Sequence, residues 1–120
     1  MSKYHALFVF NPFSKIDAMP MAPALLKGIC DSHGLKTTTL DLNIEIQIDY
    51  NKTNFATEIE KYLQFFNEMT DEAREWYKKY IKKIAQRLLD YDAEWIGFSL
   101  LSYQSLCFTH DICYQIKSIN

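Results

Sequence analysis

Polar residues stand at or just after the end of each of three apolar or β-branched segments, and these residues are the ones whose types suit chemistry. If the segments are parallel strands, their carboxyl ends meet at one edge of a sheet, where open α/β sheets bind ligands. Amide, carboxylate and hydroxyl groups at such an edge predict a binding site. Turns in which Asp and Asn bond nearby backbone remain an alternative reading of the second group. The three groups are Asn11 with Pro12, Asp41 with Asn43, and Ser99 with Ser102.

The histidines and cysteines do not form a recognisable catalytic or metal-binding pattern. Cys30, Cys107 and Cys113 are odd in number and widely spaced, which predicts free thiols in a reducing compartment. No Cys/His spacing typical of zinc occurs in the sequence. His110 stands beside Asp111 in a helical pattern, without an obvious nucleophile, and we expect it at the surface. The sequence therefore predicts no catalytic residue and no metal ligand.

Two apolar strands and the first helix must position these groups. Residues 6–10 form an unbroken apolar run, typical of a strand covered on both faces, and residues 95–101 indicate a second apolar strand. A helix is predicted over residues 21–32, with Leu25, Leu26 and Ile29 on its inner face and Gly34 as its left-handed cap. The threonine-rich residues 35–40 predict a strand at the sheet edge.

The middle and end of the chain are predicted to be largely helical. Residues 43–54 alternate isoleucine with polar residues, which indicates a strand or an extended connection. Residues 54–67 and 70–91 then form two helices, a hairpin inserted at about 54–91, with Thr70 as N-cap of the second. A last helix begins near Ser102. Its predicted inner stripe consists of Leu106, Thr109, Ile112, Cys113, Ile116 and Ile119.

This order of elements predicts one α/β domain, a three-layer Rossmann- or flavodoxin-like parallel sheet with strand order 2-1-3. Three strands are few for such a fold, and the apolar third strand would lie at an edge that invites association. We therefore expect residues 1–120 to be a truncated, partial domain, or to form a homo-oligomer through the third strand or the last helix.

Composition narrows the function classes. The 120 residues carry a net charge of −2, so no global basic field attracts nucleic acid or an anionic membrane. No apolar run approaches the roughly 18 residues that a membrane span needs, and no signal peptide is recognised. We expect a cytoplasmic protein without nucleic-acid or membrane partners. A phosphate-binding glycine loop and a GxGxxG motif are both lacking, which argues against a flavodoxin or a dinucleotide-binding domain.

The ordered set of motifs resembles the N-terminal cobalamin-binding domain of B12-dependent radical S-adenosylmethionine enzymes. This resemblance implies a cobalamin site built from the three polar groups above together with Met19, with Ser99 in a Ser-x-Leu motif beside the nucleotide tail of the cofactor. The motifs are Asn11-Pro12, residues 19–28 (MPMAPALLKG), His33-Gly34, Asp41-Leu42-Asn43 and residues 97–101 (GFSLL).

The resemblance also sets limits. The Asp-x-His-x-x-Gly loop that supplies an axial imidazole in many B12 domains is missing, which fits the radical-enzyme subgroup. The Cys-x-x-x-Cys-x-x-Cys motif is missing too, so S-adenosylmethionine and a [4Fe–4S] cluster would belong to the remainder of a parent enzyme. That enzyme would be a methyltransferase or a ring-forming catalyst in natural-product or peptide modification, and residues 1–120 alone would bind cobalamin weakly. The alternative is a non-catalytic α/β interaction or assembly module that forms a homodimer.

Overall fold

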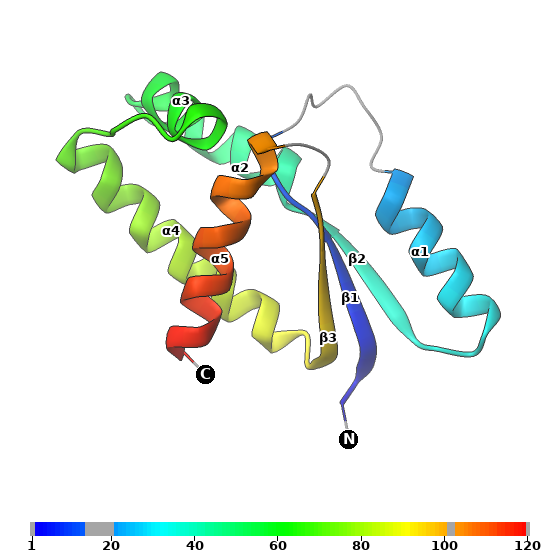
Figure 1. Ribbon diagram of the computed structural model, residues 1–120. Helices are drawn as coiled ribbons and strands as arrows, with labels where there is room; N and C mark the ends of the chain where they lie inside the picture. Colours follow the sequence, from blue (N-terminus) through cyan, green and yellow to red (C-terminus); the bar gives the residue numbers. More distant parts are fainter. Residues whose placement is uncertain (1, 14–20, 101–102, 120) are drawn as a thin grey trace.

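Three strands and their connecting helices make up the part of the chain that the computed structural model describes, residues 2–13, 21–100 and 103–119. Figure 1 shows their arrangement. The elements are β1 (Tyr4–Phe10), α1 (Met21–Ser32), β2 (Thr37–Asp41), α2 (Leu42–Tyr50), α3 (Ala56–Phe65), α4 (Asp71–Asp90), β3 (Ala93–Ser99), the short 3-10 helix η1 (Tyr103–Ser105) and α5 (Leu106–Ile119).

The strands form an open parallel sheet in the order β2-β1-β3. The fold is therefore α/β and flavodoxin-like, as the order of elements predicts. β1 is central, and its residue Phe8 lies opposite Thr39 on one side and Gly97 on the other. The two apolar strands thus lie side by side and run in the same direction.

The two faces of the sheet are covered differently. α1 lies on one face, whereas α4 and α5 lie on the other (Figure 1). Leu7 and Val9 of β1 are fully buried in the core on the α4 and α5 side. Phe8 points to the opposite side, because successive side chains of a strand alternate between faces, and it is only half-buried.

The α4 helix provides much of the core. The Thr70 hydroxyl accepts a hydrogen bond from the backbone N–H of Ala73 and so caps the helix, as predicted. One stripe of the helix is buried, and the opposite stripe carries lysines and arginines that are exposed. The buried residues are Ala73, Tyr77, Ile81, Ile84, Ala85 and Leu88.

The extended segment predicted for residues 43–54 is wrong, because residues 42–50 form helix α2. Leu42, Ile46 and Tyr50 are buried at a spacing of four residues, which is the period of a helix. The alternating isoleucines misled the prediction, since Ile44 and Ile48 are 40% and 53% exposed. Asp41 ends β2 and also caps α2, so strand and helix meet without a loop.

Two predicted helix stripes also need correction. Leu25, Leu26 and Ile29 of α1 are 66%, 46% and 51% exposed, because the helix turns the stripe of Pro23, Lys27 and Cys30 toward the sheet instead. In α5 the buried side chains include Cys107 and Phe108, whereas Leu106, Cys113 and Ile119 are exposed. The predicted face of α5 is therefore rotated, because the large Phe108 ring turns toward the core.

Candidate functional site

The carboxyl ends of all three strands meet at one edge of the sheet. Phe10, the last residue of β1, lies opposite Asp41 of β2 and opposite Ser99 of β3. The backbone thus brings together two of the residues that the sequence singles out, with Asn11 following directly. Met19 and Ser102, the other predicted contacts on the connecting loops, lie outside the described residues.

Asn11 is fully buried beneath this edge. Its Nδ2 donates to Thr109 Oγ1 over 2.9 Å, and the Thr109 hydroxyl in turn donates to the Ser105 carbonyl over 2.8 Å. This chain of donors fixes the orientation of the Asn11 amide. Its Oδ1 is buried without a hydrogen-bond partner in the described part of the chain. Pro12 is buried as well, so both residues lie within the protein and hold the β1 end against α5.

Asp41 and Asn43 have local structural roles. The Asp41 carboxylate accepts a hydrogen bond from the Ile44 backbone N–H over 3.0 Å and caps α2. Asn43 is buried, and its Oδ1 accepts from Gln47 Nε2 over 2.8 Å, one turn along the helix. These contacts match the turn-forming alternative raised for this polar cluster. A contact of either side chain with a ligand stays a prediction.

A narrow apolar groove of about 160 Å³ runs along the seam between β1 and β3, on the side of the sheet that carries α1. Phe8 and Gly97 lie within it, Leu26 of α1 forms a wall, and Ser99 stands at its carboxyl end. A Cβ atom at Gly97 would lie 3.2 Å from Phe8 Cδ1, closer than ordinary van der Waals contact. Glycine at this position therefore keeps the groove open.

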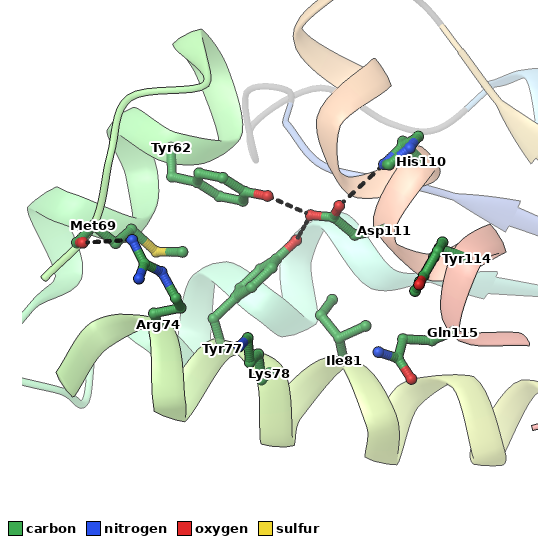
Figure 2. A pocket seen from close by; sticks show the side chains of 10 residues that line it. All are labelled: Tyr62, Met69, Arg74, Tyr77, Lys78, Ile81, His110, Asp111, Tyr114 and Gln115. Atoms are coloured by element: carbon green, nitrogen blue, oxygen red, sulfur yellow. Dashed lines mark hydrogen bonds and ion pairs between the residues drawn. The ribbon is translucent and has the colours of Figure 1, made fainter. Parts of the chain in front are cut away.

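A second cavity, of about 340 Å³, lies between α3, α4 and α5 (Figure 2). At its inner wall Tyr62 and Tyr77 each donate a phenol hydrogen bond of 2.7 Å to the same carboxylate oxygen, Asp111 Oδ2. The other oxygen, Oδ1, lies 3.2 Å from His110 Nδ1. One carboxylate on α5 thus ties α3 and α4 together.

Burial governs the ionisation of the groups around Asp111. Desolvation, reinforced by hydrogen bonding and by the nearby negative charge of Asp111, raises the pKa of Tyr62 and of Tyr77 well above the ordinary value of a phenol. Desolvation also raises the pKa of the Cys107 thiol to about 12. The phenols therefore remain neutral hydrogen-bond donors at neutral pH, and Cys107 is not a reactive thiolate.

Sequence reasoning missed the Asp111 cluster because its members come from three helices. One signal was present: Asp111 follows Cys107 by four residues and Phe108 by three, so it lies on the buried side of its helix. A carboxylate in such a position must find donors. The sequence alone does not indicate which ones.

Comparison with family models, curated proteins and solved structures gives no match to this chain. Among the described residues, no group of three or more His, Cys, Asp or Glu side chains is arranged to hold a metal ion. No helix within the described ranges is long and apolar enough to cross a membrane. The geometry of the two cavities and the motifs of the sequence are therefore the features of this chain that bear on its function.

Proposed function

We propose that this chain is the cobalamin-binding region of a B12-dependent radical S-adenosylmethionine enzyme, with cobalamin held at the carboxyl edge of the sheet. Such an enzyme would be a methyltransferase or a ring-forming catalyst acting on natural products or peptides. S-adenosylmethionine and the iron–sulfur cluster would be bound elsewhere in that protein. The cofactor would supply the cobalt chemistry, and the residues of this chain would bind and orient it.

The observation that carries the proposal is the groove at the β1 and β3 seam. In an open parallel sheet of order 2-1-3, this seam is the switch point at which ligands bind. The groove is narrow and apolar, Gly97 keeps it open, and Ser99 supplies a hydroxyl at its end. These properties suit the flat heteroaromatic base of a nucleotide tail, and the Ser-x-Leu motif of the resemblance includes Ser99.

The other candidate contacts fit the cofactor less directly. Asn11 Oδ1 is a buried acceptor in need of a donor, and amide side chains of a corrin ring carry donors. The Asn11 side chain has no exposed surface, however, so a direct contact requires the edge to open. Asp41 already caps α2. Among the described residues, Ser99 and Gly97 therefore carry the strongest prediction.

Equilibrium dialysis against hydroxocobalamin, read by the visible spectrum of the bound fraction, tests the proposal. Gly97→Ala narrows the groove, and we expect it to weaken binding about tenfold or more, about 1.4 kcal/mol. Gly28→Ala is the matched control, because a Cβ at Gly28 of α1 meets no atom within 4 Å. Thermal unfolding of both variants separates lost binding from lost folding. Because the chain is expected to bind weakly, dialysis is carried to about 1 mM hydroxocobalamin. No binding by the wild-type chain at that concentration, or equal binding by folded Gly97→Ala, would contradict the proposal.

The second candidate function is that of a non-catalytic interaction or assembly module that forms a homodimer, and one observation favours it. Trp95 of β3 is 72% exposed, on a strand that is paired on only one side within the described sheet. Exposed apolar residues on an unpaired strand edge promote association. Sedimentation velocity across a concentration series tests this: a dimer that Trp95→Lys dissociates is expected, and a monomer at every concentration would remove the candidate.

A further inference from the structure

We infer that the cavity between α3, α4 and α5 is a binding site for a small organic carboxylate with an aromatic body. The cavity is separate from the groove at the β1 and β3 seam, because it lies in the helical layer on the other side of the sheet (Figures 1 and 2). Its volume of about 340 Å³ is within the range of pockets that take small molecules. The inference is independent of the cobalamin proposal.

The walls of the cavity suit an aromatic ring. Figure 2 shows the Tyr62 and Tyr77 side chains converging on Asp111, with Tyr114 on α5 beyond that carboxylate. The two inner rings meet edge to face, with centroids 5.1 Å apart, which is a favourable and rigid arrangement. Ile81 forms the floor, and Met69 closes one end. A planar apolar group would be in contact with ring faces and aliphatic atoms on several sides.

The charged side chains that line the cavity favour an anion, because Arg74 and Lys78 of α4 carry two positive charges against the single negative charge of Asp111. Two phenols bind Asp111 Oδ2, and His110 faces Oδ1. The two phenols occupy the lone-pair positions of Asp111 Oδ2, so a cationic ligand would reach only Oδ1, beside His110. Arg74 and Lys78, one turn apart on α4, also line the cavity, and both are exposed. Their charges would repel such a ligand and attract an anion.

The present contacts of Arg74 are weak enough to be exchanged. Its guanidinium lies 3.5 Å from the carboxylate of Asp71 and 3.4 Å from the carbonyl of Met69, both at the long end of their ranges. The Asp71 side chain is fully exposed, so this ion pair contributes little. A ligand carboxylate at the rim would gain a planar guanidinium partner together with the ammonium group of Lys78.

Three probes of similar shape and different charge test the inference: phenylacetate, phenylacetamide and phenethylamine. Two-dimensional NMR of the full chain is followed during titration of each. We expect phenylacetate to bind with a Kd of about 1 mM or lower, with shifts at Tyr62, Tyr77 and Tyr114. The neutral amide should bind about threefold to tenfold more weakly, and the amine more weakly still.

Variants that remove the positive charge of Arg74 or Lys78 test whether the carboxylate of phenylacetate binds beside these residues. Arg74→Gln and Lys78→Gln should each weaken phenylacetate binding about twofold to fivefold, and together they should abolish its advantage over the amide. Lys83→Gln is the matched control, since Lys83 is an exposed lysine of the same helix outside the cavity. Equal loss in Lys83→Gln, tighter binding of the amine than of the acid, or no localised shifts at about 20 mM phenylacetate would each overturn the inference.

Discussion

Replacing Asp111 by alanine should destabilise the protein more than any other single change to an exposed or half-buried charge. The substitution removes the shared acceptor of Tyr62 and Tyr77. Hydrogen bonds to a charged group contribute about 1.5–3 kcal/mol each, and Tyr77 is only 4% exposed, so water does not readily replace its partner. Allowing for non-additivity, we expect a loss of about 3–5 kcal/mol in the free energy of unfolding.

Urea unfolding followed by tryptophan fluorescence measures this loss. Trp76 stacks on Tyr80, with ring centroids 4.9 Å apart, and so reports on the helical layer. Trp95 is already exposed and contributes little to the change. Asp111→Asn keeps an oxygen acceptor without the charge, so it should lose about half as much. Asp90→Ala, at an exposed residue of α4, is the control and should change stability by less than about 0.5 kcal/mol.

A double-mutant cycle isolates the interaction itself. Tyr77→Phe removes one phenol and leaves the ring in place, and combined with Asp111→Ala it should give a coupling energy of about 1–2 kcal/mol. A coupling energy near zero, or an Asp111→Ala protein within about 1 kcal/mol of the wild type, would refute the account of Asp111 as the tie between three helices.

Three further predictions concern the pH dependence of stability, a buried amide and an ion pair. Burial raises the pKa of the Cys107 thiol to about 12, so its contribution to stability is complete below about pH 9 and is lost progressively as pH rises toward 12. In urea titrations, the free energy of unfolding of Cys107→Ala should therefore fall less steeply with pH over that window than that of the wild type. Thr109→Val removes the acceptor of the buried Asn11 Nδ2 and should lower the free energy of unfolding by about 1–3 kcal/mol in the same assay. Asn11→Leu removes the amide itself and should lower it by less. The reverse order would contradict this account of the buried amide. Arg87 binds both carboxylate oxygens of Glu45, at 2.6 and 2.9 Å, so Arg87→Lys should lose about 0.5 kcal/mol at low salt, and concentrated salt should reduce the difference.

The strand order could be predicted from the succession of strands and helices along the chain. When helices lie on both faces of a parallel sheet, right-handed crossovers leave one topology for that succession. The bounds of α1, residues 21–32, agree between prediction and structure, because Gly34 supplies the left-handed cap with φ +77°.

Residues 42–50 could not be assigned correctly for an equally physical reason. Ile44, Ile46 and Ile48 satisfy a period of two, while Leu42, Ile46 and Tyr50 satisfy a helical period, and only burial in the folded chain separates the two patterns. The Asp111 cluster could not be predicted from the sequence for a different reason. Its donors lie 49 and 34 residues away in the sequence, and neither spacing has a local signature.

The incomplete cover of one sheet face is the feature that both functional proposals must explain. Leu25 and Ile29 of α1 and Trp95 of β3 are each more than half exposed, and β1 alternates so that Phe8 belongs to the same face. A cofactor at the seam would shield Phe8 and leave Trp95 at the margin, whereas a second copy at the β3 edge would shield Trp95 first. Trp95→Lys should therefore abolish dimerisation and spare cobalamin binding, while Gly97→Ala should do the opposite. If both variants impair the same property, the groove and the strand edge form one surface, and the two proposals are not independent.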